Sequence, residues 1–398
     1  MRYTSKRSDL TLFTALNENG MMVHASDLKA NQMLAEQQSK CYCPACGNSV
    51  ILKRGEKRLP HFAHQKDNYC ESSSESESSY HLQGKLQLYE RLKNLGMNPV
   101  LEPYFPAIKQ RADIGFIWQN TYIVLEFQCS SIPIASIIKR TQQYKKANYK
   151  PVWILGHKHI KLRKGLSRLS AFQASFLTKY KDNYIIPTYC PKEQAFHFLH
   201  TIIPISKENI FTSISKLPLD TVTLDGNRDS FYDNFPYSIW KSFIRNQKNQ
   251  QLHYPTKEND RFLRELYQYG LHPHFLPPFI GIPLKEGIRL ATSPLIWQSY
   301  LYMDSFLMQG KIISLHKIHR AFLERIKRRE VQVRSLPSII GDYRDAVNNY
   351  INVLLKCKEI EEVRPHFYKK VEDAYLSKNN IVTEEDMFFK RMQKDGWL

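Results

Sequence analysis

The sequence lacks any long hydrophobic run. Among its 398 residues, no stretch comes near the length of about 18 consecutive apolar residues that a membrane-spanning helix needs. The beginning, Met1–Leu16, has neither an unbroken apolar segment nor a small-residue cleavage pattern, so it does not predict a secretory signal. We therefore expect no membrane insertion.

Cysteine is also scarce, with seven residues in the whole chain. So few cysteines, without a secretory signal, argue against a disulfide-stabilised scaffold. Four of the seven lie between Cys41 and Cys70. This crowding predicts a local metal site in a reducing compartment, for which the cytoplasm fits best.

Acidic residues are absent from one long stretch. No Asp or Glu occurs from Phe127 to Lys181, while residues 139–181 contain twelve Lys and Arg. Over the whole chain, Lys and Arg outnumber Asp and Glu by 57 to 38, a formal net charge of +19. Such a surplus can simply serve solubility. A solvated face normally mixes both signs, however, so we expect a surface that binds phosphate groups. The candidate contacts are Lys145, Lys146, Lys161, Arg163 and Lys164.

Composition divides the chain into four regions. Residues 1–70 form a compact unit that contains two strand-like pieces joined by a turn. Residues 71–80 are dominated by Ser and Glu and predict a flexible linker. Residues 81–181 alternate between helical and strand patterns, and residues 185–398 are rich in helical signals. We expect an α/β protein with a small N-terminal zinc-binding β module and a mostly helical C-terminal region.

The alternating region predicts the order helix–strand–strand–strand–helix–strand. Apolar residues at helical spacing fill the first helix, and Gly96 ends it. Pro133 suits the first turn of the second helix. The predicted elements are a helix at His81–Leu95, strands at Pro99–Phe105, Gln110–Trp118 and Thr121–Gln128, a helix at Ile132–Asn148 and a strand at Pro151–Leu155.

A pair of cysteines and a pair of histidines have the spacing of a zinc site. The expected ligands are Cys43, Cys46, His61 and His64. Four such ligands complete a tetrahedron and leave no open position, so we expect Zn²⁺ in a structural role. Cys41 and Cys70 are spare, and either can replace one of the histidines. The alternative is a chance coincidence of buried thiols and a core histidine.

Two acidic residues are predicted to meet across a hairpin. If Gln119-Asn120 is a two-residue loop, Trp118 pairs with Thr121. Asp113 then lies opposite Glu126, with Cβ atoms roughly 4.5–5.5 Å apart. Two carboxylates so close need a cation between them. The alternatives are a one-residue slip of the register, which would separate them, and pairing of each carboxylate with its own Lys or Arg.

The string Asp113 … Glu126-Phe-Gln128, set in this order of elements, resembles the PD-(D/E)xK nuclease fold. The resemblance implies a restriction-endonuclease-like core in which Asp113 and Glu126 hold Mg²⁺ or Mn²⁺ and orient a water for attack on a phosphodiester. Gln128 stands where that family usually has Lys. A glutamine can orient water but supplies no positive charge, and Lys85 on the first helix is the candidate to replace it.

Further residues resemble the RecB-like branch of this fold. His81 lies one turn before Lys85 on the same helix face and stands where that branch carries a metal-binding His. The alternative is a helix-capping or surface histidine. Arg140-Thr-Gln-Gln-Tyr144 stands where the branch carries Gln-x-x-x-Tyr. Arg140 is long enough to hold a DNA phosphate, and Tyr144 is a candidate contact beside it, although plain packing is the more ordinary role for such a tyrosine.

The whole set of motifs resembles the competence protein CoiA family and occupies under a third of the chain. The motifs are, in order, His61-Phe-Ala-His64, His81-Leu-Gln-Gly-Lys85, Arg111-Ala-Asp-Ile114, Glu126-Phe-Gln-Cys-Ser130 and Trp153-Ile-Leu-Gly156. The resemblance implies a metal-dependent DNA nuclease of natural transformation that acts on incoming single-stranded or branched DNA, with a strand-exchange recombinase as a candidate partner. The alternative is a catalytically inactive DNA-binding adaptor that assists recombination.

Overall fold

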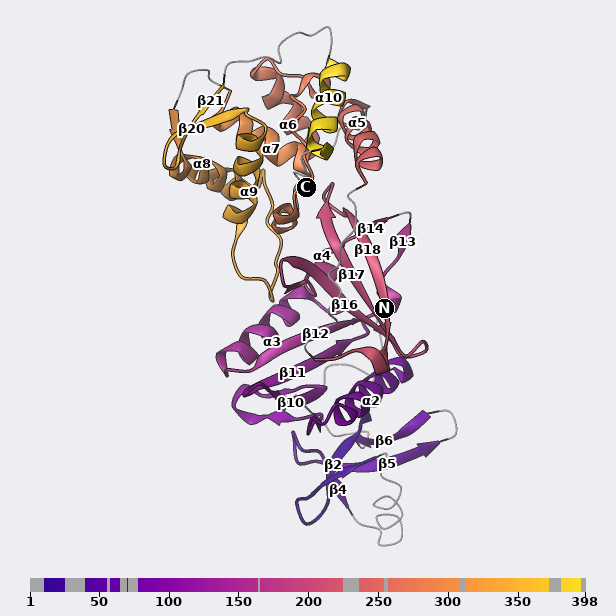
Figure 1. Ribbon diagram of the computed structural model, residues 1–398. Helices are drawn as coiled ribbons and strands as arrows, with labels where there is room; N and C mark the ends of the chain where they lie inside the picture. Colours follow the sequence, from indigo (N-terminus) through magenta and orange to yellow (C-terminus); the bar gives the residue numbers. More distant parts are fainter. Residues whose placement is uncertain are drawn as a thin grey trace, which may run out of the picture.

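Figure 1 shows a computed structural model of the chain, in which three parts follow one another along an elongated molecule. A small β module comes first, a central α/β domain follows, and a helical C-terminal domain lies at the far end. The structure describes residues 11–25, 40–55, 58–64, 70, 78–163, 165–224, 236–253, 257–307, 312–371 and 381–394. Residues 71–77 of the predicted linker lie outside this part of the chain.

The N-terminal module is a sheet of six short antiparallel strands. The two strand-like pieces expected near the start of the chain are present, with Asn17–Gly20 as the turn between them. The order of the strands is β1-β6-β5-β4-β2-β3. They are β1 (Thr11–Leu12), β2 (Thr14–Leu16), β3 (Met22–His24), β4 (Cys41–Tyr42), β5 (Ser49–Gly55) and β6 (Arg58–His64).

The module and the central domain share one hydrophobic core. Leu12 and Phe62 of the module belong to the same buried cluster as Leu88, Ile114 and Phe127 of the central domain. Burial of apolar surface is the main stabilising contribution to folding, and here part of it depends on both segments being in place. The linker therefore connects two parts that are already packed together.

The central domain begins with α2 (Ser79–Asn94), whose first turn is capped by Ser78: the hydroxyl accepts a hydrogen bond from the His81 amide at 3.2 Å. The first two predicted strands are each broken in two. Between the first pair, Glu102 has a φ of 53°, a left-handed conformation that no continuous strand contains. The resulting strands are β7 (Val100–Leu101), β8 (Tyr104–Phe105), β9 (Gln110–Arg111) and β10 (Ile114–Trp118).

The predicted hairpin and its register are confirmed. β11 (Thr121–Gln128) pairs with β10 so that Trp118 lies opposite Thr121 and Ile114 opposite Leu125. Gln119 and Asn120 have φ angles of 46° and 59°, the left-handed pair that a type I′ turn requires. The last two predicted elements follow as α3 (Ile134–Lys146) and β12 (Lys150–Gly156).

The two helices cover opposite faces of β11. Phe127 packs against α2 so closely that a Cβ on Gly84 would lie 2.2 Å from its ring, which leaves room for glycine alone. Neighbouring side chains on a strand point to opposite faces, so Glu126 points to the other side. There Tyr144 of α3 donates a hydrogen bond to its carboxylate at 2.6 Å.

The sheet continues well beyond Lys181. The prediction of a helical region from residue 185 is wrong as far as residue 218, because two long strands there are mostly buried and lack the alternation that marks a half-exposed strand. The order is β13-β14-β18-β17-β16-β12-β11-β10-β7, with β15 paired to β16. The added elements are β13 (Leu162–Arg163), β14 (Leu166–Arg168), α4 (Ala171–Ala174), β15 (Thr178–Tyr180), β16 (Asn183–Cys190), β17 (Ala195–Pro204) and β18 (Asn209–Pro218).

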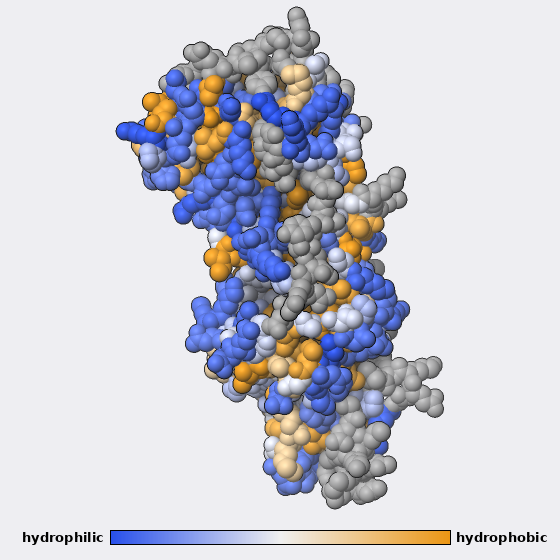
Figure 2. Space-filling view, viewed as in Figure 1, coloured by the Kyte–Doolittle hydropathy of each residue, from blue (hydrophilic) through white to orange (hydrophobic). Residues whose placement is uncertain are grey.

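From Tyr237 onward the expected helices are present. They enclose a large core that includes Trp240, Trp297 and Tyr350. None of the described helices is long and apolar enough to cross a membrane, and Figure 2 shows hydrophilic residues over much of one face. The elements are α5 (Tyr237–His253), α6 (Lys257–Gln268), α7 (Pro294–Ser305), β19 (Ile312–Ser314), α8 (Leu315–Lys327), α9 (Tyr343–Lys356), β20 (Ile360–Arg364), β21 (Phe367–Lys370) and α10 (Ile381–Lys394).

Candidate functional site

The structure gathers four metal-ligating side chains in the N-terminal module. One ligand atom from each of Cys43, Cys46, His64 and Cys70 lies within 4.8 Å of all the others. Cys46 Sγ and His64 Nε2 lie 3.3 Å apart. Cys43 directly follows β4, and His64 ends β6. Three thiols and one imidazole form a closed set of the kind that holds structural Zn²⁺.

His61 does not belong to this cluster, and its prediction as a ligand is wrong. His61 and His64 lie three residues apart in β6, and side chains alternate between the two faces along a strand. The two histidines therefore point to opposite faces of the sheet. Cys70, one of the two spare cysteines, completes the set instead.

The protonation of the cluster fits a bound cation. Burial, together with Cys70 and Cys46 close by, raises the pKa of Cys43 to about 12. Three thiolates so close together are costly without a positive charge between them, and a metal ion supplies it. Burial and the charge of Arg111 lower the pKa of His64, which favours the neutral imidazole that binds metals.

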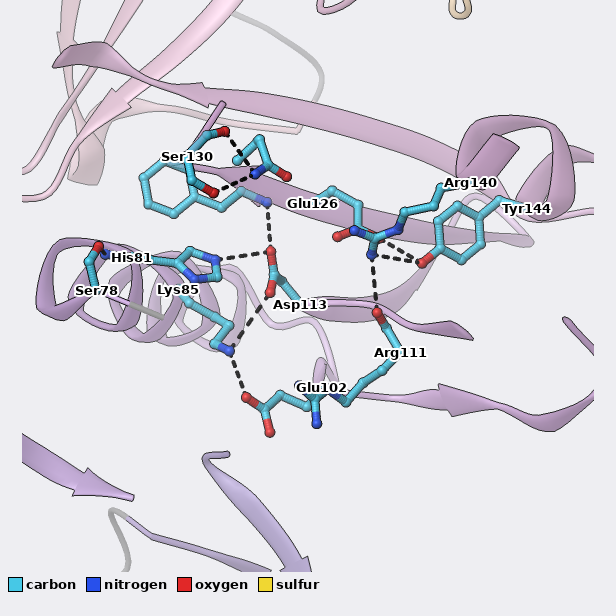
Figure 3. A network of polar contacts seen from close by, with 12 residues as sticks. Ser78, His81, Lys85, Glu102, Arg111, Asp113, Glu126, Ser130, Arg140 and Tyr144 are labelled. Carbon is cyan, nitrogen blue, oxygen red and sulfur yellow. Dashed lines mark hydrogen bonds and ion pairs between the residues drawn. The ribbon is translucent and has the colours of Figure 1, made fainter. Parts of the chain in front are cut away.

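Asp113 lies just before β10, and its carboxylate faces α2 (Figure 3). Its Oδ2 lies 3.3 Å from His81 Nε2 and accepts a hydrogen bond from the Phe127 amide at 2.8 Å. Its Oδ1 lies 3.7 Å from Lys85 Nζ. Burial on its own would raise the pKa of Asp113, but His81, Lys85 and the Phe127 amide outweigh it and hold the pKa below its usual value. Asp113 is therefore a charged carboxylate that already has its partners.

Glu126 faces α3 and has partners of its own. Its Oε1 accepts hydrogen bonds from the Arg140 guanidinium and from the Tyr144 hydroxyl (Figure 3). Burial raises the pKa of Glu126 to about 7, although Arg140 acts in the opposite direction. The charge of Asp113 adds to the rise, while the Tyr144 hydrogen bond and His81 act with Arg140 to lower the pKa of Glu126.

The expected magnesium ligands do not form a three-ligand cluster among the described residues, and the magnesium site stays a prediction. Within the described residues, the cysteine cluster is the one place where three or more His, Cys, Asp or Glu ligand atoms lie within 4.8 Å of one another. His81, Asp113 and Glu126 therefore do not form the predicted group. β10 starts at Ile114, so Asp113 lies outside the regular ladder, and its side chain turns toward α2.

Lys85, expected as the substitute for the family lysine, is fully buried and bound elsewhere. Its Nζ donates a hydrogen bond to Glu102 Oε1 at 2.6 Å. Glu102 Oε2 in turn accepts hydrogen bonds from the Phe13 amide at 3.0 Å and the Thr14 hydroxyl at 3.2 Å, both in the N-terminal module. The role of Glu102 was not predicted from the sequence, because nothing in an apparent strand at Pro99–Phe105 marks it as buried.

Gln128 does not point toward the carboxylates either. Its side-chain amide donates hydrogen bonds to the Ser130 carbonyl at 3.0 Å and to the Ser130 hydroxyl at 3.1 Å. Position 128 therefore carries no ammonium group. The amide of Gln128, which stands there instead, is hydrogen-bonded to the neighbouring Ser130.

Of the two residues predicted from the RecB-like motif, one cannot reach a ligand. Tyr144 is completely buried, so its prediction as a DNA contact is wrong. Arg140 is tied to Glu126 and to the Arg111 carbonyl, the latter at 3.1 Å, but 28% of its side chain is exposed.

Three of the predicted phosphate-binding residues lie on the described surface of the central domain. Lys145 and Lys146, in the last turn of α3, and Lys161, just before β13, are exposed. Lys145 Nζ donates a hydrogen bond to the Pro337 carbonyl of the C-terminal domain at 2.8 Å. Arg163 lies in β13, and Lys164 falls outside the described residues.

Comparison with known families accounts for most of the chain. The N-terminal, nuclease-like and C-terminal domains of competence protein CoiA match residues 25–73, 77–227 and 235–384 in turn. The chain belongs to the competence protein CoiA family. One curated relative of this family is competence protein CoiA of Bacillus subtilis (strain 168). It is 29% identical over 361 residues, which cover 87% of this chain and 93% of the relative. No solved structure matches the chain.

The family boundaries agree with the fold. The nuclease-like domain of the CoiA family extends to residue 227, past the end of β18 at Pro218. The matched C-terminal domain begins just before α5. The family therefore places the long strands that the sequence analysis missed in the nuclease-like domain and the helices in a domain of their own.

Proposed function

We propose that this member of the CoiA family binds DNA in natural transformation through a domain of the PD-(D/E)xK type that does not hydrolyse phosphodiesters. The observation that carries the proposal is that each of the two acidic groups is engaged by side chains of its own. Asp113 is held on the α2 side by His81, and Glu126 on the α3 side by Arg140. Each carboxylate already has a cationic partner, so neither needs a metal ion to balance a buried charge.

Position 128 supports the same proposal. Hydrolysis by this fold concentrates negative charge on the phosphorane, and a positive group nearby stabilises it. Gln128 supplies no charge, and its amide is hydrogen-bonded to Ser130. Lys85, which has the charge, has no exposed surface on which to meet a phosphate.

The cationic surface is the part of the proposal that concerns DNA. Lys145, Lys146 and Lys161 are exposed within the stretch that lacks acidic residues. Lysines of this kind attract the phosphate backbone without reading the base sequence, and their contribution falls as salt rises. The protein then acts as an adaptor that assists recombination, with a strand-exchange recombinase as its candidate partner.

We also assign Zn²⁺ to Cys43, Cys46, His64 and Cys70, in a structural role. None of the seven cysteines, all within the described residues, forms a disulfide. This suits a reducing compartment, and we assign the protein to the cytoplasm.

The direct test uses the purified, zinc-loaded full chain with fluorescent single-stranded, duplex and branched DNA in Mg²⁺ or Mn²⁺. We expect salt-sensitive binding and intact DNA with every substrate. The variants Asp113→Asn and Glu126→Gln should leave the DNA equally intact. Cleavage by the wild type that both variants lose would overturn the proposal.

A metal-dependent nuclease is the second candidate, and one observation favours it. The Arg140 side chain is 28% exposed, so a phosphate of bound DNA can compete with Glu126 for its guanidinium. Glu126 would then be released toward the side where DNA lies. This candidate predicts that cleavage depends on DNA length and on Arg140 as well as on both carboxylates.

A further inference from the structure

The exposed aromatic side chains of the protein are concentrated at one place. Aromatic residues make up 12% of the chain, yet among the described Phe, Trp and Tyr residues only three are exposed. They are Tyr267, Tyr269 and Phe275, with 48%, 45% and 52% of their surface accessible. All three lie within nine residues of one another, at the end of α6 and in the turn that follows it.

These side chains lie around two histidines. The His272 ring is 5.8 Å from Tyr267, 5.4 Å from His274 and 5.3 Å from Phe275, measured between ring centroids. His272 and His274 are stacked, with 19° between their planes. We call Tyr267, His272, His274 and Phe275 the ring cluster. Gly270, with a φ of 69°, makes the turn that brings Tyr267 of α6 beside the other three.

The exposed large hydrophobic side chains of this segment are all aromatic. Between Arg261 and Lys285, the exposed large hydrophobic side chains of the described residues are the three aromatic ones alone. Exposed aromatic rings are the feature by which proteins stack unpaired nucleobases.

The charge around the cluster suits a phosphate-bearing ligand. No Asp or Glu occurs from Leu266 to Lys285. Arg264 is exposed and lies one turn before Tyr267, on the same face of α6. Burial and the charge of His274 lower the pKa of His272, which keeps its ring neutral and suited to stacking at neutral pH.

We infer that the ring cluster is a stacking site for the unpaired bases of single-stranded nucleic acid. The inference rests on the proposed function and gives the C-terminal domain a role in it. The central domain holds the phosphate backbone, whereas the ring cluster distinguishes unpaired bases from a duplex, whose bases already stack on one another.

The test compares two ligands that share a phosphate backbone and differ in their bases. Fluorescence anisotropy measures binding of the full chain to oligothymidylate and to an abasic oligonucleotide of equal length. The double variant Tyr267→Ala/Phe275→Ala should bind oligothymidylate about tenfold more weakly or worse, because each stacked base contributes substantially to affinity. Its binding to the abasic strand should not change.

Two matched variants serve as controls. Tyr267→Phe/Phe275→Tyr keeps both rings and should bind oligothymidylate as the wild type does. Val333→Ala/Val363→Ala removes exposed apolar side chains of the same domain that have no rings and should also have no effect. Because all these positions are exposed, circular dichroism should show the same folded content in every variant.

Unchanged binding of oligothymidylate by the double alanine variant would overturn the inference. The ring cluster would then be a surface that binds a protein. An equal loss for both oligonucleotides would overturn it too, since it would place the effect on phosphates. If the wild type binds neither oligonucleotide at any salt concentration, the proposed function itself is wrong. This outcome concerns the wild type alone, so it is distinct from the two outcomes for the double alanine variant.

Discussion

Lys85 Nζ and Glu102 Oε1 lie 2.6 Å apart, and neither side chain has more than 1% of its surface exposed. Glu102 accepts further hydrogen bonds from Phe13 and Thr14, so this buried ion pair joins the N-terminal module to α2. Figure 3 shows the same lysine turned toward Asp113 as well. The module is thereby connected through two side chains to the acidic residue of the nuclease-like domain.

Removal of one partner of this pair should be strongly destabilising. Glu102→Ala removes the nearer carboxylate partner of the buried Lys85 ammonium, and loss of one partner of a buried ion pair costs about 3 kcal/mol or more. Glu90→Ala is the matched control, since Glu90 is half exposed and pairs with Lys93 on the surface; its effect should stay within about 0.5 kcal/mol. Urea unfolding measures both. Similar small losses for the two variants would show that the buried pair contributes little.

The same carboxyl predicts a dependence of stability on pH. Burial alone would raise the pKa of Glu102, but Lys85 and Arg111 outweigh it and hold the pKa below 4.5. A lowered folded-state pKa contributes stability that is present above the unfolded value and is lost as pH falls through the folded value. The free energy of unfolding of the wild type should therefore fall more steeply than that of Glu102→Gln below pH 4.5. Parallel curves would contradict this assignment.

Metal content separates the observed ligand set from the one expected from sequence. Cys70→Ser should lose the zinc, because it removes one of the four clustered ligands. His61→Gln should keep it, since His61 lies on the opposite face of β6. Elemental analysis of the purified proteins gives the answer. If Cys70→Ser keeps its zinc and His61→Gln loses it, the ligand set expected from the sequence is correct.

Zinc removal should affect more than the module, because the module and the central domain share a core. A chelator should lower the melting temperature of the transition that includes α2 and β11, which calorimetry with hydrogen exchange can follow. Exchange that speeds up only in residues 11–64, with α2 as protected as before, would mean that the two parts fold independently.

The phosphate-binding surface predicts a change in salt dependence. Lys145→Ala/Lys146→Ala/Lys161→Ala should weaken DNA binding and flatten the plot of log affinity against log salt, by roughly 0.7–0.9 for each phosphate that is no longer neutralised. A triple variant of exposed lysines in the C-terminal domain, Lys317→Ala/Lys356→Ala/Lys390→Ala, is the control for net charge. Equal slopes for the two triple variants would show that the predicted surface has no special role.

The sequence was informative where local rules determine the structure. The loop Gln119-Asn120 fixed the register of β10 and β11, because only a type I′ turn joins strands in two residues there. Cys43 and Cys46 were found because a Cys-x-x-Cys turn is itself a local feature.

The sequence failed where contacts distant in the chain decide. Asp113 leaves the ladder because His81 and Lys85 of α2 draw its carboxylate to their side. Cys70 completes the metal cluster although no spacing rule requires it. β16 was missed because a strand buried on both faces has no alternation to recognise.

The separation of Asp113 from Glu126 is most directly tested by Mn²⁺ binding to the zinc-loaded protein, followed by electron paramagnetic resonance with and without single-stranded DNA. We predict that the wild type binds no more Mn²⁺ than the double variant Asp113→Asn/Glu126→Gln in either condition. A stoichiometric Mn²⁺ site in the wild type that the double variant lacks would contradict the account, because it would mean that the two carboxylates do meet around a metal ion.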